Sequence, residues 1–331
     1  MSEGFSALVA HKDDDGQSAR YETLTLADLD DGDVTVDIEY STLNYKDGLA
    51  MTGSIPIVQR HPLILGIDYA GTVSESSHAG FKSGDRVVLN GYGASEYLHG
   101  GYARRARVSG DLLVKLPDSL STRQAMAIGT AGYTAMLSVM ALQAGGPEPG
   151  DGEILVTGAA GGVGSVAISL LARLGYHVVA STGRSQETDF LTGNVAAQII
   201  DRAALGEHGN PLQQERWAGA VDCVGSHTLA NVIAQTRYDG IVTACGLAQG
   251  ADLPATVMPF ILRSVQLRGV DSVQAPLARR IEAWRRLATE LDLAQLETLS
   301  FDLPFDKLLE TGPKILAGAV RGRAVVDLTT A

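Results

Sequence analysis

The spacing of hydrophobic residues along the first third of the chain is that of β-strands. Val34, Val36, Ile38 and Tyr40 alternate with polar residues, which is the two-residue period of a half-buried strand. Other short apolar runs are separated by turn clusters rich in Gly, Asp and Ser; they are "FSALVAH", "YAGTVSE", "DRVVLNG" and "DLLVKL". Several short strands at this spacing predict a compact β-barrel.

The period changes at Ser121. Ser121 and Gln124 have the spacing of a helix capping box, and the apolar stretch "AMAIGTAGYTAMLSVMAL" follows them. From Glu153 onward, short apolar runs alternate with helical segments; the runs are "EILVT", "HVVAS", "QIID", "AVDCVG", "GIVTACG" and "VQLRGV". Strict alternation of strand and helix predicts an α/β domain with a doubly wound parallel sheet.

The pattern predicts two domains. Residues 123–292 form the doubly wound domain, and residues 1–122 form the β-rich one together with residues 293–331, because the last segment ends in another alternating strand. A length of 331 residues is enough for two cores.

Composition narrows the class of protein. Hydrophobic residues make up 45% and charged residues 19%, which is typical of a globular chain, and the net charge of −12 argues against nucleic acid as a partner. The N-terminal residues lack the pattern of a signal peptide, and no run of eighteen apolar residues occurs, so we expect a cytoplasmic protein without a membrane partner. Cys223 and Cys245 are too few for a disulfide framework or a Cys-rich zinc site, and we expect reduced, buried thiols.

A glycine-rich turn, "GAAGGVGS", follows the strand that ends at Thr157 and precedes an amphipathic helix. Ala159, Gly161 and Gly164 take the three positions of the dinucleotide fingerprint, so the first glycine is replaced. Such a turn lets backbone N–H groups and the helix N-terminus bind a pyrophosphate. The context predicts a dinucleotide site; a tight turn without a ligand is the alternative.

The tip of the second strand indicates which dinucleotide is bound. An acid at this tip would bind the ribose of NAD and repel a 2′-phosphate, but the sequence there is Ser181, Thr182, Gly183 and Arg184. Two hydroxyls, a glycine and a guanidinium suit a phosphate, and Arg202 after the third strand can reach the same group. NADPH is therefore predicted, unless Arg184 is only a solvated loop residue.

With these motifs in place, the chain resembles the medium-chain dehydrogenases/reductases of the zinc-independent, quinone-oxidoreductase type, and most closely their acrylyl-CoA reductase (NADPH) subgroup. The resemblance covers nearly the whole chain, and "LNYKD" and "PFILR…LRGVDSV" are its subgroup-specific segments. Shared family segments include "PLILGIDYAGTV", "IGTAGYTA", "VTGAAGGVGS" and "GRAVV".

The resemblance implies a GroES-like barrel for the first domain, a Rossmann fold for the second, an active site in the cleft between domains, and a homodimer joined near "VQLRGVDS". It also implies that NADPH contacts fifteen residues: Asn44, Thr130, Ala160, Gly161, Gly162, Val163, Ser181, Thr182, Gly183, Arg184, Arg202, Gly246, Leu247, Ile261 and Ser272. Two of these residues have a purely structural alternative to a cofactor role. Asn44 could be a turn residue, and Ile261 could pack in the core.

The sequence departs from the zinc-dependent relatives, which have a His-Glu pair where Ile67 and Asp68 stand, so no metal is expected. The resemblance implies reduction of the double bond of acrylyl-CoA, giving propionyl-CoA. Negative charge then builds on the thioester oxygen, and a proton is needed at the α-carbon. Backbone N–H groups, Asn44 or Arg323 are candidates for the first task. Tyr45 or a water is a candidate for the second, although Tyr45 could be core packing and Arg323 a surface residue.

Two other functions stay open. One is reduction of quinones or general enones, and the other is NADPH binding without catalysis. Because CoA is anionic and the chain acidic, local basic groups are expected near the substrate, with Arg104, Arg105 and Arg107, or Arg263 and Arg268, as candidates. The four arginines of "LARRIEAWRRLATEL" (Arg279, Arg280, Arg285 and Arg286) are interpreted instead as the solvated face of an amphipathic helix.

Overall fold

The computed structural model of the protein describes residues 4–14, 16–183 and 197–330. The chain divides into two compact units. Unit 1 contains Met1–Thr130, Ser272–Ala288 and Leu296–Ala331, and unit 2 contains Ala131–Asp271 and Thr289–Gln295. These bounds differ from the boundaries expected after residue 122 and before residue 293. The difference has a physical cause, because residues 127–130 and 272–284 bond to the strands of unit 1.

Unit 1 is built on β-strands. Its sheets have the strand orders β2-β1-β4 and β15-β16-β3-β5-β6-β8, and β7 also pairs with β3. The strands are β1 (Phe5–Asp13), β2 (Gly16–Leu24), β3 (Val34–Leu43), β4 (Leu63–Ile64), β5 (Asp68–Ser76), β6 (Arg86–Asn90), β7 (Arg105–Val108), β8 (Val114–Lys115), β15 (Ser300–Pro304) and β16 (Arg323–Asp327). Four of the apolar runs that predicted strands in the first third correspond to β1, β5, β6 and β8.

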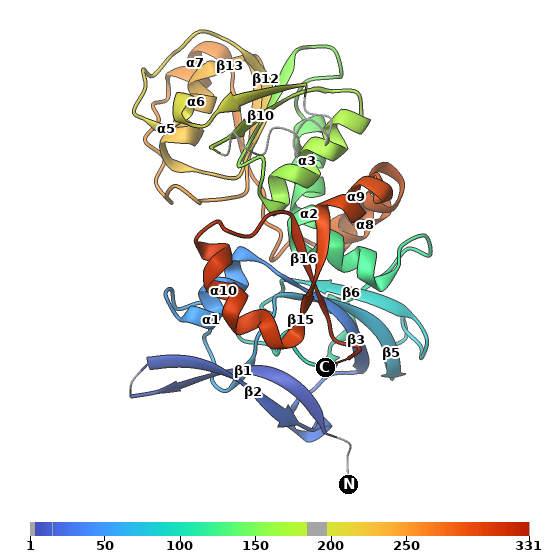
Figure 1. The fold of residues 1–331 in the computed structure, drawn as a ribbon. Helices are drawn as coiled ribbons and strands as arrows, with labels where there is room; N and C mark the ends of the chain where they lie inside the picture. The colour runs from blue at the N-terminus through green and yellow to red at the C-terminus, as the bar shows by residue number, and fades with distance from the viewer. Residues whose placement is uncertain (1–3, 15, 184–196, 331) are drawn as a thin grey trace. The chain divides into compact units, whose positions relative to one another are not determined.

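Strand β3 organises unit 1. Its first residues pair antiparallel with β7, its last residues pair antiparallel with β16, and β5 lies along its other edge. Val34, Val36 and Ile38 are buried as predicted, whereas Tyr40 is half-exposed. The last segment, which we expected to return to the first domain, contributes β16, and β16 pairs with β3. Figure 1 shows α10 (Leu308–Leu316), near the end of the chain, beside α1 (Tyr45–Thr52).

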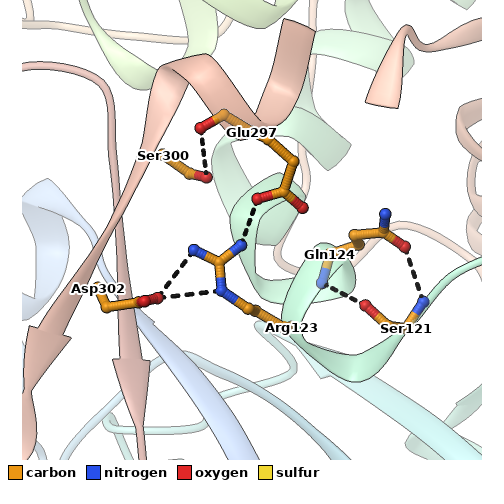
Figure 2. Close-up of polar contacts among 6 residues, drawn as sticks. All are labelled: Ser121, Arg123, Gln124, Glu297, Ser300 and Asp302. Carbon is orange, nitrogen blue, oxygen red and sulfur yellow. Dashed lines mark hydrogen bonds and ion pairs between the residues drawn. The ribbon is translucent and has the colours of Figure 1, made fainter. Parts of the chain in front are cut away.

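Helix α2 (Thr122–Gln143) begins at the predicted capping box. The Ser121 N–H donates to the Gln124 side chain and the Gln124 N–H donates to the Ser121 hydroxyl, at 3.0 and 3.1 Å (Figure 2). Arg123 joins this end of the helix to the last third of the chain through Glu297 of α9 (Leu293–Leu299) and Asp302 of β15 (Figure 2). Gly129 interrupts the helix with φ 51° and ψ −165°.

By length and hydropathy, α2 is long and apolar enough to cross a membrane, and 83% of its most apolar window is buried inside the protein. Burial of this kind is what the core helix of a globular protein shows, so α2 is weak evidence for a membrane span.

Unit 2 holds one six-stranded parallel sheet with the order β11-β10-β9-β12-β13-β14. Its strands are β9 (Glu153–Thr157), β10 (His177–Thr182), β11 (Gln198–Asp201), β12 (Trp217–Asp222), β13 (Thr236–Ala244) and β14 (Gln266–Gly269). Among the described residues, the helices between these strands are α3 (Gly162–Arg173), α5 (Ala203–Gly206), α6 (Ser226–Gln235) and α7 (Met258–Arg263). The order reverses direction at β9, and right-handed crossovers then place α3 and α6 on opposite faces. The predicted doubly wound sheet is confirmed.

One helix corrects the sequence interpretation. Arg280 in α8 (Leu277–Glu290) is only 2% exposed, so it is not part of a solvated face. It shares a helical stripe with the buried Trp284 and Leu287, and its guanidinium lies 3.6 Å from the Tyr92 ring centroid. Arg279 and Arg285 are exposed and Arg286 is half-exposed, as expected for a solvated face.

Candidate active site

The glycine turn after β9 has the shape that the fingerprint requires. Gly158 has φ 61°, and its carbonyl oxygen accepts the Gly161 N–H at 2.9 Å. A Cβ on Gly164 would lie 2.4 Å from that same carbonyl oxygen, so the first turn of α3 packs against the strand only because residue 164 lacks a side chain. The exposed Gly161 caps α3, which leaves N–H groups of the first turn available to an anion.

The predicted phosphate-binding residues meet at the ends of β10 and β11. These strands are parallel, with Thr182 opposite Asp201, so Ser181, Thr182 and Gly183 lie next to Arg202. A Cβ on Gly183 would lie 2.4 Å from the Arg202 Nε, which means that the guanidinium crosses the glycine backbone at contact distance. Arg184 lies outside the described residues.

A buried acid, Asp222, links the ends of β9 and β12. It was not among the predicted site residues. The Asp222 carboxylate at the end of β12 accepts the Thr157 hydroxyl at 2.7 Å and the Gly225 N–H at 2.8 Å. Burial raises the pKa of Asp222. Gly246 and Leu247, two predicted cofactor residues after β13, line an open cavity of about 500 Å³ that also includes Cys245 and Asp271.

Unit 1 contains a buried polar network centred on Asp68. One carboxylate oxygen accepts the Thr42 hydroxyl at 2.7 Å, and the other accepts the Asn44 amide at 3.1 Å and the Thr130 backbone N–H at 2.7 Å. Three donors on one carboxylate offset the cost of burying its charge. The structure thus joins two predicted residues, Asn44 and Thr130, through an acid that was not predicted as part of the site.

The network determines the orientation of the Asn44 amide. Its nitrogen donates to the Thr42 hydroxyl and to Asp68, and its oxygen accepts Nη2 of Arg323 at 3.4 Å. The opposite orientation would set an amide oxygen against a carboxylate and an NH₂ group against a guanidinium. Asn44 is also the N-cap residue of α1, and its backbone N–H donates to the Asp47 carboxylate, as in a capping box.

Arg323 supplies the positive charge of the network. It is 3% exposed, so the surface alternative for this residue is wrong. Its Nε donates to the Ala127 carbonyl at 3.0 Å, and a Cβ on Gly129 would lie 2.5 Å from Nη2, so the glycine kink in α2 makes room for the guanidinium. Burial lowers the pKa of Arg323, while the charges of Asp68 and Asp47 oppose this effect.

Asp47 is the second acid beside this cation. Its carboxylate accepts the backbone N–H groups of Asn44 at 2.8 Å and Ile67 at 2.9 Å. Burial and the nearby Asp68 carboxylate raise the pKa of Asp47 to about 7. The Tyr102 hydroxyl donates to the Thr42 carbonyl at 2.8 Å, and burial, together with the charges of Asp47 and Asp68, raises the pKa of Tyr102. Two acids around one guanidinium therefore favour one protonated carboxyl.

The other predicted residues are placed as follows. Tyr45 is 49% exposed on α1 and Ile261 is 72% exposed on α7, so neither is core packing. The half-exposed Ser272 has its carbonyl held by Arg280, which also bonds the Asn90 carbonyl. Among the candidates for CoA binding, Arg105 pairs with Asp37 at 3.3 Å and Arg263 donates to the Gln213 and Ala234 carbonyls.

The sequence held a signal for the acids it did not assign to the site. Asp68 and Asp222 each stand inside an apolar run, "ILGIDYAG" and "AVDCVG", and an acid in a buried strand must be hydrogen-bonded. Asp47 stands three residues after Asn44, which is capping-box spacing. None of these patterns identifies the partner residue.

The residues present at this site do not fit a catalytic zinc ion. Both Asp68 oxygens already accept donors, and a guanidinium lies beside them. In the part of the chain that the structure describes, no three His, Cys, Asp or Glu side chains are grouped as a metal site would need.

Comparison with known proteins identifies the family of the chain. The model of the alcohol dehydrogenase GroES-like domain matches residues 30–118, and the zinc-binding dehydrogenase model matches residues 162–291. The acrylyl-CoA reductase AcuI of Ruegeria pomeroyi is 51% identical over 327 residues, which cover 98% of this chain and 99% of that protein. YhfP of Bacillus subtilis, whose name assigns it provisionally to the quinone oxidoreductases, is 42% identical over 99% of this chain and 100% of that protein.

Solved structures show the same architecture. The crystal structure of the Salmonella enterica oxidoreductase YhdH in complex with NADP has a TM-score of 0.96 and 48% identity, and the match covers 98% of this chain and 100% of that one. Bacillus subtilis YhfP with NAD bound has a TM-score of 0.95 and 42% identity, over 99% of this chain and 100% of that one. The chain therefore belongs to the medium-chain dehydrogenase/reductase family of the quinone-oxidoreductase type, together with the bacterial acrylyl-CoA reductases.

Proposed function

We propose that the protein reduces the carbon–carbon double bond of acrylyl-CoA with NADPH, giving propionyl-CoA. The observation that carries this proposal is the 51% identity to an acrylyl-CoA reductase over nearly the full length of both chains. Identity of this extent, with a matching fold at a TM-score of 0.96 to an NADP-bound relative, supports an oxidoreductase that uses a nicotinamide dinucleotide.

The choice of NADPH rests on the ends of β10 and β11. Ser181 and Thr182 offer hydroxyls. Gly183 has no side chain, which leaves room for Arg202 to lie against its backbone. The pyrophosphate would be held by the turn of Ala160, Gly161, Gly162 and Val163. When bound, the reduced nicotinamide supplies a hydride, and the protein supplies orientation and charge.

Asn44 and Arg323 would have different polar roles in unit 1. Because the Asn44 amide nitrogen donates to Thr42 and Asp68, Asn44 offers a ligand only its oxygen, which suits a ribose hydroxyl and not an oxyanion. The bonds of Arg323 among the described residues start from Nε and Nη2, so Nη1 is the donor we assign to the developing negative charge on the thioester oxygen. The half-exposed hydroxyl side chain of Tyr45 is our candidate proton source.

Three further features belong to the proposal. The reaction would need no zinc, because Asp68 is held by three donors where a metal ligand would have to be free. The protein would act in the cytoplasm, and it would be a homodimer joined near residues 265–272, as the sequence resemblance implies.

Reduction of quinones is the second candidate. It is supported by the 42% identity to YhfP, whose name points to that activity. The experiment is to mix the purified protein with NADPH and either acrylyl-CoA or a quinone, and to follow the loss of nicotinamide absorbance. We expect faster turnover with acrylyl-CoA; faster turnover with the quinone would support the second candidate. No turnover with either would indicate NADPH binding without catalysis.

The cofactor assignment has its own test. Arg202→Ala and Arg184→Ala should each raise the KM for NADPH about 10-fold, because each removes a charged hydrogen bond to the 2′-phosphate, and should leave the KM for NADH unchanged. The matched control is Arg173→Ala, which removes an exposed charge from the last turn of α3. An unchanged KM for NADPH in both variants, with NADH still rejected, would contradict the assignment.

A further inference from the structure

The two cysteines of the chain lie side by side at the ends of neighbouring strands. Cys223 follows β12 and Cys245 follows β13, and the register of these parallel strands pairs Asp222 with Ala244 one position earlier. The two sulfur atoms are 3.8 Å apart. Neighbouring strands are about 4.8 Å apart, which is within the Cα separation of about 4.4–6.8 Å that a disulfide tolerates. A bond would require the sulfurs to approach by roughly 1.8 Å.

The backbone that carries the thiols is held firmly. The Cys223 N–H donates to the Thr157 hydroxyl at 3.0 Å, and the Cys245 N–H donates to the Asp222 carbonyl at 2.9 Å. Asp222 itself holds the N–H groups of residues 224 and 225. Closing the gap between the sulfurs therefore falls mainly on the two side chains and on the turns that follow them.

The thiols are not equivalent. Cys245 is part of the wall of the open cavity of about 500 Å³, whereas Cys223 is not among the residues that line it. The hydrogen bond between the two thiols lowers the pKa of Cys245 and raises the pKa of Cys223. Both thiols are half-exposed, and the one that lines the cavity is thus the more nucleophilic, because it is the thiolate that attacks.

We propose that Cys245 and Cys223 form an oxidation site, at which a hydroperoxide converts the thiol pair into an intramolecular disulfide. The Cys245 thiolate attacks the peroxide, the O–O bond breaks, and an alcohol or water leaves, so that Cys245 becomes a sulfenic acid. The Cys223 sulfur then attacks the Cys245 sulfur, and the hydroxyl leaves as water with the Cys223 proton. The two thiols lose two electrons and two protons, and the peroxide gains both.

The disulfide would act on cofactor binding, and this part of the proposal rests on the proposed function. A Cβ on Gly246 would lie 2.2 Å from the Cys223 carbonyl oxygen, and a Cβ on Gly225 would lie 3.2 Å from the Leu247 Cα. The turns after β12 and β13 are therefore in direct backbone contact. Pulling the sulfurs together would strain these turns, which contain Gly246 and Leu247, two residues that we assign to NADPH binding, so the oxidised protein should bind NADPH more weakly.

The oxidation itself is tested by mass spectrometry and thiol titration. The reduced protein, freed of reductant, is treated with hydrogen peroxide. We expect it to lose both titratable thiols and two hydrogen atoms without gaining oxygen, and to recover both thiols with dithiothreitol. Because the chain has two cysteines, such a product is the 223–245 disulfide. Retention of both thiols, a disulfide-linked dimer on a non-reducing gel, or oxygen gain without a disulfide would overturn the proposal.

Single variants test the assigned roles of the two thiols. In Cys223→Ser, Cys245 should stop at the sulfenic acid and react with dimedone, whereas in Cys245→Ser, Cys223 should stay largely unmodified. The reverse pattern would overturn the assignment of Cys245 as the attacking thiol.

The coupling to the cofactor is measured separately. The Kd for NADPH, from cofactor fluorescence, should rise about 10-fold on oxidation and should not respond to peroxide in the double serine variant. A disulfide that leaves the Kd unchanged would overturn the coupling, whereas failure of the reduced protein to bind NADPH would instead count against the proposed function.

Discussion

Each buried charge in unit 1 is matched by groups of the opposite kind. Asp68 accepts three donors, Asp47 accepts two backbone N–H groups, and Arg323 lies beside both acids. Burying a charge without such partners would cost several kcal/mol. Two acids beside one guanidinium favour one protonated carboxyl, and this has a measurable consequence.

The free energy of unfolding should depend on the protonation of Asp47. Its pKa is raised above 3.8 in the folded chain, so the folded state holds a proton that the unfolded state releases. Between about pH 4 and pH 7 this group makes stability fall as the pH rises, by at most about 1.4 kcal/mol per pH unit. Asp47→Asn removes that contribution, so in denaturant unfolding at several pH values the stability should fall less, or rise more, with pH than in the wild type.

The control separates this effect from the general response of the acids. Asp37→Asn alters a half-exposed aspartate on β3 and should keep the wild-type slope. Acids with lowered pKa values, such as Asp30 and Asp85, lose their stabilising charge only toward lower pH, outside the window used here. If Asp47→Asn shows the wild-type slope, Asp47 is ionised in the folded protein.

For single residues, the sequence predicted which residues belong to the candidate site better than it predicted their roles. Asn44 and Arg323 were candidates because of their motifs, but only the folded chain shows that Asp68 commits the hydrogens of the Asn44 amide. These hydrogen bonds join residues 44, 68 and 323, which lie far apart in the sequence. A local sequence pattern holds no information about such pairs. Arg280 is a second example of this limit of sequence patterns. Its charge favours an exposed side chain, but its position four residues before Trp284 puts it on the buried side of the helix.

Helices and strands were predictable where local physics decides them. The Ser121–Gln124 capping box, the glycine turn before α3 and the strands of the parallel sheet all occur as expected. Strand limits were less predictable: the run "AVDCVG" suggested a strand through residue 225, whereas β12 ends at Asp222. The Asp222 side chain accepts the N–H groups of the next turn and thereby ends the strand.

The turn before α3 provides a test at the scale of an element. Gly164→Ala should lower the free energy of unfolding by about 1–3 kcal/mol, because its Cβ would clash with the Gly158 carbonyl and push α3 from the sheet. The same displacement should weaken NADPH binding, since the N–H groups that we assign to the pyrophosphate would move with the helix. Denaturant unfolding and cofactor fluorescence measure the two effects.

A second glycine in a helix supplies the control for that variant. Gly206 ends α5 and has no atom within 4 Å of its ideal Cβ, so Gly206→Ala should leave both quantities near their wild-type values. Equal NADPH affinity in Gly164→Ala and the wild type would show that the close packing at residue 164 is not needed for the cofactor.

At the scale of the whole molecule, the negative net charge of the chain opposes the binding of anionic ligands, so local positive groups have to compensate for it. The chain carries a net charge of −12, and it is proposed to bind two polyanions, NADPH and an acyl-CoA. Long-range repulsion disfavours both ligands, and it disfavours NADPH more than NADH because of the additional phosphate. Selectivity for NADPH therefore requires short-range attraction that exceeds this repulsion at the ends of β10 and β11.

The dependence of selectivity on salt shows which force dominates. Raising the salt concentration from about 0.01 M to 0.1 M shortens the screening length from roughly 30 Å to 10 Å. If Arg202 and Arg184 bind the 2′-phosphate, the ratio of the Kd for NADH to that for NADPH should fall several-fold over this range, and Arg202→Ala should flatten the dependence. If net repulsion dominated, screening would favour the more highly charged cofactor and the ratio would rise. Titration of both cofactors by fluorescence gives the sign, and a rising ratio would mean that no guanidinium holds the extra phosphate.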